Sequence, residues 1–178
     1  MDRKQERAFE EFVAGSGDAL LRLATLLACD EGMGEDAYQE TLHRLAARWS
    51  RVQSPQAYCR RVLNNVIIDQ ARARQRRPSE IRLVDGHDDG DPQAADAADA
   101  VELRPALLAA LGTLTQQQRT IVVLRYFDDR SENEVADLLG VSPGTVKSTA
   151  SRAMAHLRQQ PGLLAVTEYH TEQRTRYA

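Results

Sequence analysis

One segment of the chain cannot join a hydrophobic core, and it constrains the fold more than any other feature. Residues 78–104 are rich in Asp, Ala, Gly and Pro, hold eight acidic residues against two arginines, and show no sustained apolar stripe. Such a segment is expected to stay solvated, because it buries too little apolar surface to offset the entropy lost on ordering. We therefore expect a flexible acidic linker between two small domains, residues 5–77 and 105–158, with an extension of unassigned role at residues 159–178.

Both domains are predicted to be helical. The chain has 178 residues, of which 42% are hydrophobic, mostly Ala, Leu and Val, and only 5% are aromatic. This composition favours helix over sheet and supplies enough apolar residues for a buried core. Apolar periodicity in the first domain predicts a helix up to about Leu27 with a break or restart near residues 15–17, a helix from Gly34 to Trp49, and a helix after the turn at residues 54–55. The predicted fold class is all-α.

Helix-start and helix-stop signals organise the second domain. A Ser or Thr followed three residues later by Glu or Gln forms a capping box, and a glycine just past a helix end suits the left-handed backbone found there. These signals predict a helix over 105–111, a helix opened by a Thr115–Gln118 capping box and ending at Tyr126, a helix opened by a Ser131–Glu134 capping box and closed by Gly140, and a last helix over about 144–158.

The last two predicted helices have the spacing of a helix-turn-helix. Ala136 is the small residue where the helices touch, Gly140 lies at the sharp turn, and Val146 holds the second helix against the first. Apolar residues recur from Val146 to Leu157 and face inward, which leaves a face of short polar and cationic side chains that can enter the major groove. Residues 141–158 include no acid, whereas a solvated surface would mix both charges. The outward residues are Thr145, Lys147, Ser148, Ser151, Arg152 and Arg158.

A second basic surface is predicted on the third helix. Residues 60–77 contain six arginines and a single acidic residue, Asp69. Basic helices also occur as solvated surfaces and as RNA-binding patches, so this run alone leaves the partner open. Two basic helical modules on one tether can, however, grip a duplex at two places and gain avidity. The formal net charge of −3 thus conceals two basic patches that flank an acidic bridge.

Enzyme, metal and membrane functions find little support. The sequence has no phosphate loop or nucleophile elbow, its four histidines are scattered, and Cys29 and Cys59 stand apart as expected of reduced thiols. Residues 85–96 approach a calcium loop, but His87 replaces one ligand and the bidentate Glu is absent. No apolar run is long enough to span a membrane, and the charged N-terminus lacks a secretory signal. We expect a cytoplasmic protein with no catalytic residue, metal site or cofactor.

Three motifs together resemble the extracytoplasmic-function class of bacterial RNA polymerase sigma factors. They are the run over residues 34–41, the run over residues 54–65 with Asp69, and the helix-turn-helix run over residues 140–158. Within this class, the sequence resembles the actinobacterial SigE-like group of the sigma-70 superfamily. It covers residues 5–158, both domains in order, and implies a factor that binds the polymerase core and directs promoter recognition, DNA melting and transcription initiation at a specific regulon.

The resemblance implies that the first domain is sigma region two, whose second helix docks on the coiled coil of the polymerase β′ subunit. Core RNA polymerase is therefore an expected partner. Glu40 and Arg44 also have the spacing of an ordinary ion pair on a helix surface, so the same residues allow a purely structural interpretation. The positions that match the docking face are Asp36, Gln39, Glu40 and Arg44.

The same domain is expected to contact the start-proximal promoter element. In the family, the loop that matches residues 50–57 captures a base flipped from the non-template strand, which needs binding energy to offset the loss of stacking. Trp49 and Tyr58 are candidates to assist this step, and core packing is at least as good an interpretation of each. The positions assigned to promoter contact are Arg61, Asn64, Asn65, Asp69, Arg72 and Arg76.

The second domain would be sigma region four, which reads the distal promoter element and also docks on the polymerase β flap. Arg125 and Arg130 are candidates for additional phosphate contacts. The acidic linker either threads the RNA exit path or is an inert tether, and an anti-sigma factor is a further expected partner. The positions that match the major-groove face are Ser142, Gly144, Thr145, Lys147, Ser148, Ser151 and Arg152.

A stand-alone helix-turn-helix repressor or activator is the alternative from a different class. A lone helix-turn-helix with an extra helical domain would also bind DNA. Such regulators usually dimerise on a palindrome, whereas a sigma factor binds the core as one copy and reads two unlike elements. Gel filtration with core polymerase, followed by footprinting, separates these two interpretations.

Overall fold

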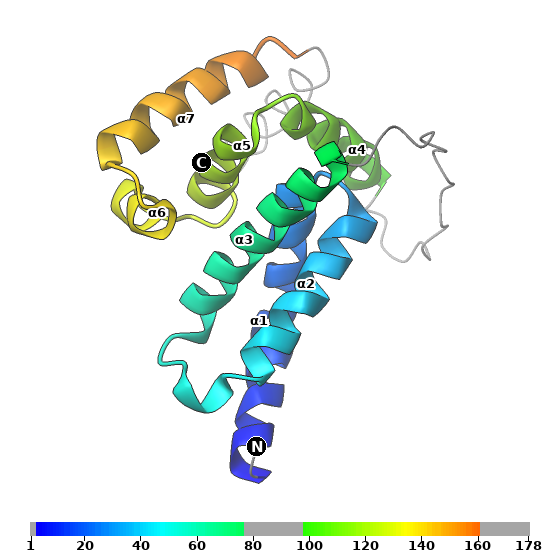
Figure 1. The fold of residues 1–178 in the computed structure, drawn as a ribbon. Helices are drawn as coiled ribbons and strands as arrows, with labels where there is room; N and C mark the ends of the chain where they lie inside the picture. The colour runs from blue at the N-terminus through cyan, green and yellow to red at the C-terminus, as the bar shows by residue number, and fades with distance from the viewer. Residues whose placement is uncertain (1–2, 77–97, 161–178) are drawn as a thin grey trace, which may run out of the picture.

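The structure is a computed structural model that describes residues 3–76 and 98–160, in which every regular element is helical (Figure 1). The all-α fold class is confirmed. Most of the predicted linker and of the C-terminal extension, together with the calcium-like run, lies outside the described residues. The helices are α1 (Arg3–Ala28), α2 (Glu31–Ala46), the short 3-10 helix η1 (Trp49–Arg51), α3 (Pro55–Arg76), α4 (Ala98–Gly112), α5 (Gln116–Tyr126), α6 (Glu132–Leu139) and α7 (Pro143–Leu157).

Helices α1, α2 and α3 form a bundle, and α5, α6 and α7 gather at the end of it that lies away from the N-terminus (Figure 1). Helix α1 runs without interruption through residues 15–17, so the predicted break there was wrong. Gly17 is buried where α1 meets α2, and a Cβ on it would lie 2.8 Å from the hydroxyl oxygen of Tyr38. The glycine thus serves close helix packing and does not end the helix.

Helix α2 begins three residues earlier than predicted, because Asp30 caps it. The Asp30 carboxylate accepts a hydrogen bond from the backbone N–H of Met33 at 2.8 Å. The helix ends at Ala46, and Trp49 belongs to η1. Its indole packs against Phe9 at 5.3 Å between ring centroids, which fixes the chain between α2 and α3 on the side of α1.

The helix-start and helix-stop signals at Thr115, Ser131 and Gly140 in the second domain are confirmed. Both capping boxes are present: Thr115 and Gln118 exchange hydrogen bonds at the start of α5, and Ser131 and Glu134 do so at the start of α6. Gly140 follows α6 with φ of 67°, the left-handed backbone predicted for it. Helix α4 was predicted too short, since the backbone is helical from Ala98, and the last residues of the predicted linker are therefore helical.

The two domains pack against each other in this structure. Helix α1 contacts α5, and α3 is tied to the loop between α5 and α6 by an ion pair between Arg60 and Asp128. Sequence patterns gave no sign of this contact, because they report which side of a helix is apolar and not which distant segment covers it.

The close packing of α2 against α1 at Gly34 predicts a stability effect. A Cβ at Gly34 would lie 2.6 Å from the Cα of Thr25, and helix backbone cannot yield as a side chain can. We expect Gly34→Ala to lower the free energy of unfolding by about 1–3 kcal/mol, the usual cost of overpacking. Gly15→Ala is the matched control, because a Cβ there meets no atom within 4 Å and alanine favours helix. Urea denaturation measures both, and equal midpoints would contradict the packing role of Gly34.

The capping box of α6 predicts a pH effect. The pKa of Glu134 is lowered to about 2, first because its carboxylate accepts the backbone N–H of Ser131. The Arg130 guanidinium lowers it further, because it hydrogen-bonds to the same carboxylate and attracts its negative charge. A carboxylate with a lowered folded-state pKa stabilises the fold above its ordinary pKa of 4.5, and the effect is lost as pH falls toward about 2. We expect the free energy of unfolding to fall more steeply over this window in the wild type than in Glu134→Gln, whose neutral amide can cap as Gln118 does. Denaturation at a series of pH values measures both slopes, and parallel slopes would contradict the assignment.

Candidate nucleic-acid interface

Helix α7 presents the polar face that the sequence predicts. Its inner residues, from Val146 through Ala150 to Leu157, are buried, and its N-terminus is capped by Ser142, whose hydroxyl accepts the backbone N–H of Thr145 at 3.1 Å. Pro143 occupies the first helical position, where its missing N–H costs nothing. The assigned groove residues Ser142, Gly144, Lys147, Ser148, Ser151 and Arg152 are exposed, and Thr145 is half-buried.

The packing of α6 holds this face outward. Val146 is fully buried against the helix-turn-helix core, and Ala136 on α6 is buried with it. The backbone N–H of Val141 donates to the carbonyl of Ala136 at 3.1 Å, which closes the turn at Gly140. A larger residue at position 136 would push the two helices apart. The spacing predicted for a helix-turn-helix is thus the geometry found.

A second polar stripe runs along α3. Arg61, Asn65, Asp69 and Arg72 are all exposed, while Cys59, Val62, Leu63, Val66 and Ile67 are buried on the other side. Asp69 and Arg72 lie 3.9 Å apart in an exposed ion pair, which contributes little to stability. Arg76 belongs to α3, and its side chain lies outside the described residues.

Asn64 is buried, unlike the exposed residues of α3 that are assigned to promoter contact. It is only 7% exposed, and its side-chain oxygen accepts a hydrogen bond from the Thr120 hydroxyl at 3.2 Å. Thr120 lies on α5, in the other domain. Asn64 therefore faces the second domain here and is not available to DNA, an arrangement that helical periodicity alone could not reveal.

A cationic cavity of about 580 Å³ opens beside the segment between α2 and α3. Tyr58 lines it, and its hydroxyl lies 3.5 Å from the carbonyl oxygen of Arg44. Trp49 is instead packed on Phe9 and Phe12, so the core interpretation holds for this residue. The lining residues are Arg48, Arg51, Val52, Gln53, Ser54, Ala57, Tyr58 and Arg61. Three guanidinium groups with one aromatic ring suit a nucleotide, since they offer both phosphate contacts and a stacking surface.

Helix α2 carries the residues assigned to polymerase docking. Asp36, Gln39 and Arg44 are exposed, and Glu40 is half-buried. The Arg44 Nε lies 2.7 Å from Glu40 Oε1, so the ordinary surface pair does form. Its side chains are nearly half exposed, and a pair of this kind contributes only a few tenths of a kcal/mol, about 0.3–0.5, to helix stability.

The two thiols are unreactive in character. Cys59 is buried in the core, and burial raises its pKa to about 11. Burial also raises the pKa of Cys29, which is half-buried at the end of α1. Both therefore stay protonated near neutral pH, and a protonated thiol is a poor nucleophile and metal ligand. Within the described residues, no group of three His, Cys, Asp or Glu side chains is placed to hold a metal ion.

The chain matches two families in the order expected for its domains. Sigma-70 region 2 matches residues 12–77, and Sigma-70, region 4 matches residues 104–157. The chain belongs to the sigma-70 family. A stand-alone regulator would share the helix-turn-helix but would have no need of region 2, so the match across both domains favours a sigma factor over a repressor or activator.

Curated relatives and a solved structure agree with this assignment. The RNA polymerase sigma-E factor of Streptomyces coelicolor is 39% identical over 157 residues, which is 85% of each chain. The extracytoplasmic-function sigma factor SigL of Mycobacterium tuberculosis is 31% identical over 159 residues, 83% of this chain and 85% of the relative. The structure of CnrH in complex with the cytosolic domain of CnrY matches with a TM-score of 0.62 and 25% identity over 86% of each chain. The predicted likeness to the SigE-like group is confirmed.

The protein is therefore a sigma factor, which binds RNA polymerase core and directs promoter recognition and transcription initiation. Among residues 3–76 and 98–160, no helix is long and apolar enough to cross a membrane.

Proposed function

We propose that promoter reading is divided between the exposed faces of α7 and α3. The exposed, acid-free face of α7 is the observation that carries this proposal. Short hydroxyl side chains let a helix enter the major groove, about 12 Å wide, and Lys147 and Arg152 can reach phosphates and guanine edges. Region four, residues 105–158, thus reads the distal element through Ser142, Gly144, Thr145, Lys147, Ser148, Ser151 and Arg152.

Region two, residues 5–77, reads the start-proximal element. The exposed stripe of Arg61, Asn65, Asp69 and Arg72 supports this role. Arg76 and Asn64 join it by their match to the family, Asn64 only where the second domain no longer covers it. The arginine-lined cavity beside η1 receives the flipped base, with Tyr58 as the stacking ring. Residues 78–104 connect the two readers.

Partners follow from the same division. The α2 face at Asp36, Gln39, Glu40 and Arg44 docks on the β′ coiled coil, and region four docks on the β flap. The matching structure of CnrH contains a bound protein, the cytosolic domain of CnrY, which supports a further protein partner for this chain, and we propose that this partner is an anti-sigma factor. The protein acts in the cytoplasm as a non-enzymatic initiation factor without a cofactor, because its proposed surfaces bind polymerase and DNA and carry no catalytic group.

The α7 face predicts a loss of promoter affinity without a loss of core affinity. We expect Lys147→Ala and Arg152→Ala each to weaken promoter binding by the polymerase–sigma complex by about 1–3 kcal/mol. Lys4→Ala removes the same charge from exposed α1 and serves as the control. Gel shifts on a promoter fragment and titration with labelled core measure the two affinities. Equal losses in both assays would contradict the assignment of this face to DNA.

The α2 face predicts the reverse. Asp36→Ala combined with Glu40→Ala should weaken core binding by about 1–2 kcal/mol, the range of a modest interface contact. The control is Glu6→Ala combined with Glu10→Ala, which makes the same charge change on exposed α1. Core affinity that matched the wild type would count against the proposed docking face.

A further inference from the structure

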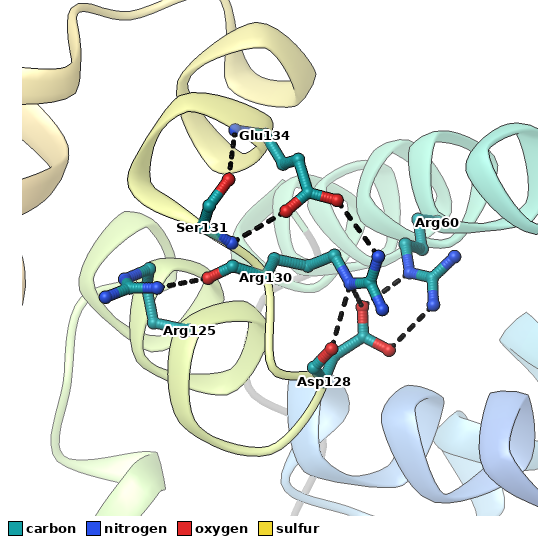
Figure 2. A network of polar contacts seen from close by, with 6 residues as sticks. All are labelled: Arg60, Arg125, Asp128, Arg130, Ser131 and Glu134. Atoms are coloured by element: carbon teal, nitrogen blue, oxygen red, sulfur yellow. Dashed lines mark hydrogen bonds and ion pairs between the residues drawn. The ribbon is translucent and has the colours of Figure 1, made fainter.

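One ion pair ties region four to region two. Arg60 on α3 donates from Nε to Asp128 Oδ2 at 2.5 Å and from Nη2 to Asp128 Oδ1 at 2.9 Å (Figure 2). The two side chains are 15% and 17% exposed. A two-pronged, partly buried pair of this kind is stronger and more directional than a surface pair. The two residues are 68 positions apart in the sequence, so the pair can form only when the domains meet.

Asp128 is held in place for this contact. Arg130 donates from Nε to the Asp128 backbone carbonyl at 2.9 Å and lies 3.2 Å from its carboxylate. The same guanidinium reaches Glu134, which in turn accepts the Ser131 N–H in the capping box of α6 (Figure 2). Arg125 donates to the Arg130 carbonyl from the other side. The loop between α5 and α6 therefore presents Asp128 in a fixed position, which lowers the entropic cost of binding Arg60.

Two further polar contacts from α5 reach region two. Arg119 donates to the Leu27 carbonyl at 3.2 Å, at the end of α1, where the helix dipole leaves carbonyl oxygens negative. The Thr120 hydroxyl donates to the Asn64 side-chain oxygen at 3.2 Å. Thr120 is 2% exposed, so this hydrogen bond lies inside the domain interface. The interface thus withdraws a promoter-contact residue from solvent.

The interface is not sealed like a core. An open cavity of about 380 Å³ lies between α3 and the second domain, lined by Asn64, Ile68, Ala71 and Arg72 on one side and by Gln116, Gln117, Thr120 and Leu139 on the other. Well-packed interiors leave few voids larger than a water molecule. An interface that combines an open cavity with a partly buried ion pair resembles the polar contacts between domains that open and close.

We propose that the Arg60–Asp128 pair and the Thr120–Asn64 hydrogen bond form a latch that closes the free sigma factor and keeps Asn64 from promoter DNA until the domains part. The promoter role of Asn64 rests on the proposed function above. Only the open fraction of the protein can then use Asn64, and the apparent affinity falls in proportion to that fraction.

Charge reversal of the latch tests closure directly. Arg60→Glu and Asp128→Arg each place like charges face to face, and the double variant restores the pair with its ends exchanged. Small-angle X-ray scattering of the free, full-length protein should show the radius of gyration rise by about 3 Å or more in each single variant, as expected when two compact domains separate. The double variant should return toward the wild-type value.

The matched controls are Arg7→Glu and Glu11→Arg, which make the same charge changes in an exposed pair within α1. These should leave the radius of gyration unchanged. Circular dichroism checks that every variant is folded. An unchanged radius of gyration in folded single variants, or a wild type as extended as they are, would overturn the latch.

A transcription assay tests what the latch does. In run-off transcription with core polymerase, Asp128→Arg and the uncharged Thr120→Val should reach half-maximal output at a sigma concentration about three- to tenfold lower than the wild type. Glu11→Arg controls for added positive charge and should match the wild type. Variants that open in scattering but need as much protein as the wild type would overturn the sequestering role. The promoter role of Asn64 is tested apart from closure by the promoter affinity of Asn64→Ala in the polymerase–sigma complex: an unchanged affinity would overturn that role and leave the scattering result standing.

Discussion

Burial of one apolar stripe on each helix is the constraint that places every functional side chain. On α3, the stripe from Cys59 to Ile67 is buried, and the exposed arginines and Asn65 must then face away from the bundle. On α7, Val146 and Leu157 are buried and the hydroxyl and cationic residues point outward. Burying an aliphatic side chain of this size contributes about 1.5–3 kcal/mol, which is far more than any surface ion pair. Packing therefore fixes the geometry on which charge recognition depends.

Charge is sorted along the chain and not balanced within each element. The net charge of −3 would suit a protein that avoids nucleic acid, yet the described part of α7 carries Lys147 and Arg152 with no acid, and the arginine run lies on α3. The acidic side chains of the second domain lie instead on α6 and in the loop before it, where Glu134 caps the helix and pairs with Arg130, which in turn pairs with Asp128. The basic face of α7 can therefore contact phosphate, while Asp128 in the same domain pairs with Arg60 of region two.

Local signals made most of the fold and of the groove face predictable. The capping boxes at Thr115 and Ser131, the left-handed Gly140 and the inward stripe of α7 all depend on residues within a few positions of one another, and each was found as predicted. The failures have physical causes of other kinds. The turn-like residues 15–17 remain helical because Gly17 packs against Tyr38, and Asn64 is buried because Thr120, distant in sequence, covers it. No periodic pattern carries information about such contacts.

Footprinting of the polymerase–sigma complex shows whether the two domains read two unlike promoter elements and whether they do so only when bound to core. Run-off transcription with core polymerase on genomic fragments first identifies a promoter, and DNase I and permanganate footprints are then taken with and without core. We expect two separate, unlike protected elements with unpaired thymines at the start-proximal one, all dependent on core. A symmetric footprint over an inverted repeat, formed by the free protein and unchanged by core polymerase, would contradict it.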